Sequence, residues 1–215
     1  RVTLEDVRRY LLNQGGVADR IRQLLIEELL AAWSAGDEVL LIGHSLGSVI
    51  AYDALWQLSR EQHHPGRVEL LLTLGSPLAT RFIRRGLRGA NERGARRFPD
   101  NIARWVNVAA RGEMVALHRR IGPFFAGMRR QGLIERIEDL PNVYNHFRVA
   151  GRLNVHKSYG YLNHPAVAGL IAEDKTLDQA LSNPLYDAEA RRKVLTSLIE
   201  RLGLSQVMSQ FLTLL

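Results

Sequence analysis

The amino-acid sequence predicts an α/β fold, with a mainly parallel sheet covered by helices and a helical C-terminal tail. Two observations support this class. Short apolar runs at residues 38–42, 68–74 and 105–109 alternate with segments whose apolar residues recur at helical spacing. The run at residues 68–74 is apolar almost throughout, as in a strand that a parallel sheet buries on both faces.

Composition narrows the class of protein. The chain has 215 residues, of which 46% are hydrophobic, and this suits one globular domain or a domain with a small appendage. It contains no cysteine, so disulfides, thiolate metal sites and cysteine nucleophiles are excluded. No apolar run approaches ~18 residues and no leader-like segment opens the chain, so we expect a cytoplasmic protein without a transmembrane segment. The first residue is arginine rather than methionine, which suggests processing or an excised fragment.

The net charge of +7 is carried mainly by arginine. One interpretation of the basic stretch over residues 81–104 is a loop that attracts anions such as nucleic acid, acidic lipid or a carboxylated substrate. The other is a solvated connection, which we favour because no nucleic-acid-binding motif accompanies it, and we predict no nucleic-acid partner. The arginines are interleaved with glycines and comprise Arg81, Arg84, Arg85, Arg88, Arg93, Arg96, Arg97 and Arg104.

Two helices are predicted before the first strand. Apolar residues recur at helical spacing over residues 4–12 and 17–33, and two adjacent glycines interrupt the pattern between them. No strand-like run precedes the strand at residues 38–42. We therefore predict that this strand has an unpaired apolar edge, covered by self-association or by a strand from another segment.

The segment Gly43-His44-Ser45-Leu46-Gly47 lies between that strand and a helical pattern. A serine raised on a sharp strand-to-helix turn needs neighbours without a Cβ atom, and the two glycines supply them. The hydroxyl then projects above the end of the sheet, where the N-terminus of the following helix favours developing negative charge. We predict a nucleophile elbow made by Gly43, His44 and Gly47, with Ser45 as the nucleophile. The alternative is an ordinary strand-to-helix loop.

Further elements follow the second strand. We predict a third strand at residues 105–109, a helix over about residues 115–128, a short fourth strand at residues 147–150 and a helix near residues 166–171. Phe124, Phe125 and Met128 have two interpretations, either a lid or acyl pocket, or packing in the core.

A serine nucleophile needs a base within hydrogen-bond reach. In an open parallel sheet the site lies beyond the carboxyl ends of the strands. His156 follows the predicted last strand by a few residues and satisfies this requirement, with His118 and His164 as alternatives. The adjacent histidines on the turn after the elbow helix have no obvious third ligand, so no metal or other cofactor is predicted. Residues placed before a strand are disfavoured as partners of Ser45, and these are His63, His64, Asp100 and His146.

The base in turn needs an acid that orients it. Glu113 is the first carboxylate at a suitable strand end, just past the strand at residues 105–109. We predict that Glu113 orients His156, and the alternative is a surface glutamate that caps the following helix. The backbone amide of Leu46 is the predicted oxyanion donor.

Four segments in this order resemble the lipase and esterase branch of the α/β-hydrolase superfamily, namely residues 41–48, 72–77, 105–107 and 156–159. The resemblance covers about residues 3–172 and implies a partial α/β-hydrolase fold that lacks its N-terminal strands. Nucleophile, acid and histidine then fall on Ser45, Glu113 and His156. Similar members usually carry aspartate where Glu113 stands, and often a second aspartate where this chain has Ala110.

The resemblance implies a serine hydrolase that cleaves carboxylic esters, with a small-molecule or lipid ester as substrate and an acyl-enzyme intermediate. The alternative is a non-catalytic interaction module, or an incomplete hydrolase fragment that needs a partner or another segment to complete its sheet. Because the strand that supplies a second oxyanion donor is missing, we expect slow activity and a homo-oligomer formed through the sheet edge.

Residues 173–215 are predicted to be a helical tail or an appended fragment. Within residues 175–215, the segments 181–185, 202–205 and 211–215 resemble part of the N-terminal helical domain of the F-type ATP synthase delta subunit. This resemblance implies that the chain joins two unrelated fragments. The alternative is a terminal helical hairpin that packs on the sheet domain.

Overall fold

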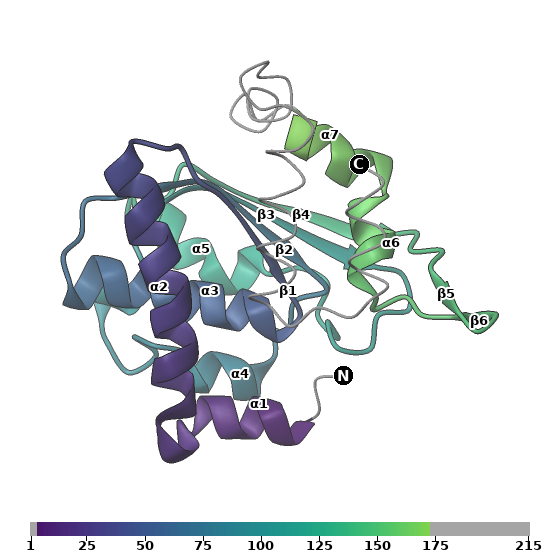
Figure 1. Ribbon diagram of the computed structural model, residues 1–215, viewed down its shortest axis with the longest axis horizontal. Coiled ribbons are helices and arrows are strands. Elements are labelled where there is room, and N and C mark those ends of the chain that lie inside the picture. Colours follow the sequence, from purple (N-terminus) through teal and green to yellow (C-terminus); the bar gives the residue numbers. More distant parts are fainter. Residues whose placement is uncertain (1–3, 173–215) are drawn as a thin grey trace. The chain divides into compact units, whose positions relative to one another are not determined.

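The computed structural model describes residues 4–172 and contains a four-stranded parallel sheet in the order β1-β2-β3-β4 (Figure 1). The strands are β1 (Leu40–His44), β2 (Val68–Leu74), β3 (Ile102–Ala110) and β4 (Arg136–Val143). The predicted α/β class is therefore correct. In the described residues β1 is an edge strand, as its sequence context predicts.

Helices connect and cover these strands (Figure 1). The chain divides into two compact units, Arg1–Leu170 and Ile171–Leu215, and the sheet belongs to the first. The predicted helical tail and its boundary at residue 172 lie at or outside the described residues and stay predictions. The remaining elements are α1 (Leu4–Leu11), η1 (Gln14–Gly16), α2 (Val17–Ala35), α3 (Leu46–Trp56), the π-helical turn η2 (Gln57–Glu61), α4 (Arg81–Gly86), η3 (Gly94–Arg97), α5 (Gly122–Arg130), β5 (Arg148–Val149), β6 (Arg152–Leu153), α6 (Ser158–Leu162) and α7 (Pro165–Ala172).

The core forms between the sheet and the helices α2, α3 and α5, which lie together on one side of the strands in Figure 1. Trp105 of β3 is fully buried, and its ring centroid lies 4.9 Å from that of Phe125. Tyr52 of α3 packs on both rings. Phe125 and Met128 are thus core residues, so the lid or acyl-pocket interpretation does not hold for them. Burial of such large apolar side chains is the main source of stability for this layer.

The fourth strand is not where the sequence predicts it. Residues 147–150 form only the two-residue strand β5, which pairs antiparallel with β6 in a separate ribbon. The fourth strand of the main sheet is β4, whose sequence RIEDLPNV is half polar and half-exposed over most of its length. An edge strand does not need a continuous apolar run, and for this reason the apolar pattern did not reveal β4.

The helix predicted over residues 115–128 is also shorter than expected. The chain from Arg111 to Ile121 forms turns, and α5 begins at Gly122 with Pro123 in its first turn. Asp139 of β4 accepts hydrogen bonds from the amides of Ile121 (2.8 Å) and Gly122 (2.9 Å). These bonds satisfy amides at the helix start, so a carboxylate distant in sequence helps to set where α5 begins.

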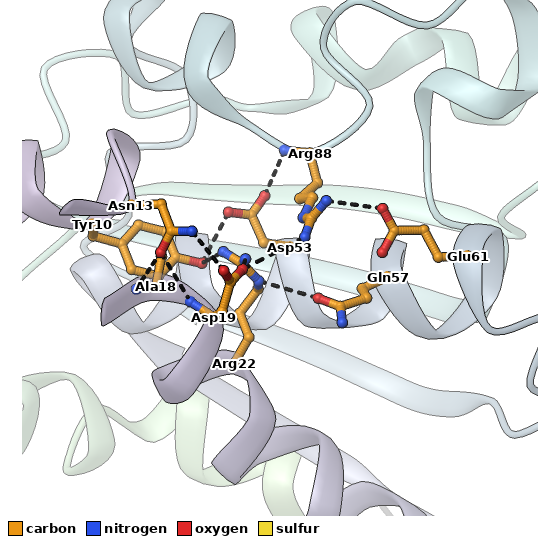
Figure 2. Close-up of polar contacts among 9 residues, drawn as sticks. All are labelled: Tyr10, Asn13, Ala18, Asp19, Arg22, Asp53, Gln57, Glu61 and Arg88. Atoms are coloured by element: carbon orange, nitrogen blue, oxygen red, sulfur yellow. Dashed lines mark hydrogen bonds and ion pairs between the residues drawn. The ribbon is translucent and has the colours of Figure 1, made fainter. Parts of the chain in front are cut away.

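A buried polar network ties the N-terminal helices to α3, and Figure 2 shows it around Asp53. Tyr10 of α1 donates its hydroxyl to Asp53 at 2.9 Å, and the backbone amide of Arg88 donates at 2.8 Å. Arg22 of α2 contacts the Tyr10 hydroxyl at 3.4 Å and donates to Gln57 at 3.2 Å. Burial raises the pKa of Asp53 to about 6, and the hydrogen bonds from Arg88 and Tyr10 only partly oppose that effect.

This network predicts a pH-dependent stability that Asp53→Asn removes. The folded-state pKa of Asp53 lies above its unfolded value of 3.8. The protonated carboxyl therefore stabilises the fold fully when the pH is below 3.8, and this contribution is lost as the pH rises through about 6. Urea unfolding of the wild type should therefore give a free energy of unfolding that falls by about 1–3 kcal/mol from this group between about pH 4 and about pH 7. Asp53→Asn should lack that part of the slope. Equal slopes for the two proteins would contradict the assignment.

Candidate functional site

Ser45 follows β1 on a strained turn. Its φ of 54° and ψ of −127° are unfavourable for a residue with a side chain. The turn is held because Ser45 N–H donates to Leu74 O at 3.0 Å, while Ser45 O accepts the Ser48 amide at 3.1 Å and the Ser48 hydroxyl at 2.6 Å. A Cβ atom on Gly43 would lie 2.7 Å from Ser48 Cα, which explains the glycine at that position.

Ser45, His156 and Glu113 form one hydrogen-bonded chain. Ser45 Oγ lies 3.0 Å from His156 Nε2, and His156 Nδ1 lies 2.8 Å from Glu113 Oε2. Glu113 is buried, with its side chain 1% exposed, whereas the His156 side chain is 31% exposed. The three residues that the sequence predicts as one site are thus linked by two hydrogen bonds through His156, although 111 residues separate the serine from the histidine.

The Glu113 carboxylate is held from several sides. Oε1 accepts the amide of Val115 at 2.9 Å, and Oε2 accepts the Tyr161 hydroxyl at 2.9 Å. The Tyr161 hydroxyl oxygen accepts the Ala110 amide at 3.0 Å, so the tyrosine is itself fixed. Burial pushes the pKa of Glu113 upward, but the hydrogen bonds from His156, Val115 and Tyr161 together hold it below its usual value. The carboxylate is therefore ionised at neutral pH.

The loop that carries His156 is clamped by two residues whose roles the sequence did not predict. The Asn145 amide donates to the carbonyls of Val155 and Lys157, both at 2.8 Å. His44 Nε2 lies 2.6 Å from His156 O, so this nitrogen must carry the proton. Burial lowers the pKa of His44 to about 4 and keeps its ring neutral. No motif marks Asn145, because its partners lie 10 and 12 residues away in a loop.

The other predicted candidates lie elsewhere. His118 packs edge-on against Phe124, and His164 Nδ1 accepts the amide of Ala166. His146 precedes the short strand β5, as predicted, although it also follows β4 of the main sheet, and its ring stacks on Tyr144 rather than reaching Ser45. The predicted oxyanion donor Leu46 and the predicted elbow residue Gly47 are the first residues of α3, where backbone amides lack partners within the helix.

This arrangement has a defined chemical capacity. His156 can accept the Ser45 hydroxyl proton on Nε2, while Glu113 fixes the ring and balances the resulting charge. The neutral Leu46 amide at the helix start is the predicted donor to developing negative charge. Among the described residues no strand precedes β1, so the segment from which a second donor was expected is not found there.

Comparison with known proteins gives short matches. The chain is 55% identical over 42 residues to ATP synthase subunit delta of Desulfosudis oleivorans, which covers 20% of this chain and 23% of that protein. It is 51% identical over 39 residues to ATP synthase subunit delta of Desulforapulum autotrophicum, which covers 18% of this chain and 21% of that protein. The chain thus spans less than a quarter of each relative. No protein-family model matches. No solved structure matches significantly.

These findings support the predicted resemblance to ATP synthase subunit delta and contradict the predicted function. The named relatives are ATP synthase subunits and not ester hydrolases, so the predictions of a serine esterase or lipase and of an enzyme of that class are wrong by this comparison, although the matches cover about a fifth of the chain. The specific α/β-hydrolase resemblance receives no support from the family models or the solved structures. Among the helices described, none is long and apolar enough to cross a membrane.

Proposed function

We propose that this chain is an interaction module that completes its sheet by pairing β1 with β1 of a second copy. The observation that carries the proposal is the difference between the two edges of the sheet. β1 reads LLIGH, without a carboxylate, lysine, arginine or proline, and Ile42 at its centre is 40% exposed. Among residues 4–172 no further strand pairs with β1, and an unpaired apolar edge of this kind is a template for another strand.

The opposite edge has the features that normally prevent such pairing. β4 reads RIEDLPNV, with three charged residues before Leu140 and a proline at position 141. Charged side chains and proline on an edge strand oppose the addition of a further strand. The contrast supports β1 as the pairing edge.

A second copy is the occupant that fits this edge. The Ser45 amide points toward β2, and backbone groups alternate along a strand. Leu40, Ile42 and His44 therefore direct theirs toward the free flank, the side of β1 on which no described strand lies. Two identical apolar strands can exchange these hydrogen bonds in antiparallel fashion about a twofold axis centred on Ile42. Neither strand brings a charged carboxylate, lysine or arginine into the contact.

A cytoplasmic location is part of this proposal, because a chain without cysteine is compatible with a reducing compartment.

Sedimentation velocity over a dilution series tests the proposal. We expect one boundary that shifts with concentration from the mass of one chain toward that of two. Because each copy carries a net charge of +7, added salt should screen the repulsion and increase the dimer fraction. A single boundary at the mass of one chain over the whole series, at low and at high salt, would overturn the proposal.

We also propose that Ser45, His156 and Glu113 act as one site with a reactive serine hydroxyl. Ester hydrolysis is not part of that role. The distances of 3.0 Å and 2.8 Å along the chain of three side chains support the assignment. With a fluorophosphonate, Ser45 Oγ would form a bond to phosphorus, fluoride would leave, and the serine proton would pass to His156 Nε2.

Asn145→Asp provides a test of how this site is held. The aspartate has nearly the same shape but places an oxygen opposite the carbonyls of Val155 and Lys157, so the His156 loop should move. We expect one phosphonyl group per wild-type chain, none in Ser45→Ala, and labelling of Asn145→Asp slowed by about tenfold or more. Intact-mass spectrometry measures the rate. Unchanged labelling in Ser45→Ala would show that Ser45 is not the reactive residue. Unchanged labelling in Asn145→Asp would show that Asn145 does not hold the His156 loop in place.

A further inference from the structure

Four arginine side chains line one hollow on the surface beside α4. The hollow has a volume of about 420 Å³, and no carboxylate lines it among the described residues. Three of the arginines come from the short helix α4 and the fourth from η3, with two small or neutral residues of the turn between them. The lining residues are Arg81, Arg84, Arg85, Ala90, Asn91 and Arg97.

These arginines differ from their neighbours in their charge partners. Three other arginines of this region have carboxylate partners: Arg88 pairs with Glu61 at 2.8 Å, Arg96 pairs with Glu92 at 3.5 Å, and Arg60 pairs with Asp100 at 2.7 Å. Over residues 4–172, by contrast, no ion pair involves any of the four that line the hollow. Every carboxylate near this stretch of the sequence is thus engaged outside the hollow.

The walls of the hollow are held in place by contacts behind them. Trp56 of α3 donates to the carbonyl of Arg96 at 2.9 Å, and Arg60 donates to the carbonyls of Phe98 and Ala95 at 2.7 and 2.9 Å. On the other wall, Arg84 donates to Ala79 O at 3.3 Å. A binding group fixed in advance loses less conformational entropy when a ligand arrives.

One guanidinium also lies on an aromatic ring. The Arg84 guanidinium carbon is 4.2 Å from the ring centroid of Phe124, a cation–π distance. This contact orients the side chain and leaves its charge uncompensated. Four such charges within one concavity favour a ligand that concentrates several negative charges in a small volume.

We propose that this hollow binds a ligand that carries at least two clustered phosphate groups. Guanidinium groups bind phosphate oxygens through paired hydrogen bonds, and a diphosphate offers the charge density that a single carboxylate lacks. The phosphates come either from a soluble oligophosphate or from a lipid headgroup. The site is independent of β1 pairing and of Ser45, because none of its lining residues belongs to β1 or contacts the Ser45 hydrogen-bonded chain.

Titration calorimetry with inorganic pyrophosphate and cosedimentation with phosphatidylcholine vesicles, with and without phosphatidylinositol bisphosphate, test the proposal. The test variant combines Arg81→Gln with Arg85→Gln, because both side chains are exposed and unpaired in the described chain. The control combines Arg93→Gln with Arg130→Gln, which removes the same charge from exposed positions outside the hollow. We expect the test variant to bind about 100-fold more weakly and the control to change affinity by less than about threefold, since each lost charge-assisted bond costs roughly tenfold.

The two arms identify the source of the phosphate. Pyrophosphate binding that weakens with salt indicates a soluble oligophosphate, and binding only to vesicles with phosphatidylinositol bisphosphate indicates a lipid headgroup. Absence of binding in both arms would overturn the proposal. Equal losses of affinity in the test and control variants would also overturn it, because they would show that binding depends on the net charge of the protein and not on the arginines of the hollow.

Discussion

Ile42→Pro is expected to abolish dimer formation and leave a folded monomer. Ile42 lies at the middle of β1, and its amide points to the free flank because the Ser45 amide points to β2. Proline removes this one donor and places its ring in the path of an incoming strand, while the hydrogen bonds between β1 and β2 remain. Sedimentation velocity should show the mass of one chain at concentrations where the wild type dimerises.

Two further variants at Ile42 separate the backbone effect from the side-chain effect. Ile42→Val keeps the amide and most of the apolar surface, so it should dimerise like the wild type. Ile42→Lys keeps the amide but adds a charge to the edge, and it should be monomeric even if Ile42→Pro fails to fold. A dimer that persists in Ile42→Lys, with a wild-type circular dichroism spectrum, would contradict pairing through β1.

Gly43→Ala is expected to lower the free energy of unfolding by about 3 kcal/mol. The new Cβ atom would lie 2.7 Å from Ser48 Cα and 3.0 Å from Ser48 N, and both are backbone atoms that cannot rotate away. Either β1 or the start of α3 must therefore shift. Urea unfolding followed by circular dichroism measures the loss.

Gly47→Ala is the matched control for this prediction. A Cβ atom on Gly47 meets nothing within 4 Å, and the residue lies in the first turn of α3. Alanine there should raise the free energy of unfolding by about 0.5 kcal/mol, since it has the higher helix propensity. If both alanines have the same effect, the close approach of Gly43 to α3 does not limit stability.

The fold could be predicted where apolar residues decide the local structure. β2 spans Val68–Leu74 as predicted, because a central strand of a parallel sheet is buried on both faces and its sequence is continuously apolar. β4 could not be predicted in this way, because charged residues interrupt its apolar pattern and its register depends on contacts with β3. The start of α5 depends on Asp139, a partner 17 residues away from Gly122.

The site shows the same division. Ser45 and Glu113 follow β1 and β3 as predicted, and residues at the carboxyl ends of parallel strands meet at one edge of the sheet. His156 was predicted from a strand at residues 147–150 that the parallel sheet does not contain, and it follows the separate β5–β6 ribbon instead. The supports Asn145 and Tyr161 could not be selected. Asn145 acts through backbone carbonyls, which carry no residue-specific signal, and Tyr161 donates to a carboxylate that lies 48 residues away in the sequence. Geometry alone also did not establish function, because the named relatives are ATP synthase subunits.

Disulfide trapping at Ile42 tests the pairing of β1 with β1 most directly. The chain has no cysteine, so Ile42→Cys introduces the only thiol. Opposed residues in an antiparallel pair have Cα atoms about 4.5–5.5 Å apart, within the range that a disulfide spans. Mild oxidation of Ile42→Cys should give a covalent dimer that reducing agent returns to monomer, whereas Arg136→Cys on the exposed edge of β4 should stay monomeric. Oxidised Ile42→Cys that remains monomeric, or equal cross-linking at both positions, would contradict the interface.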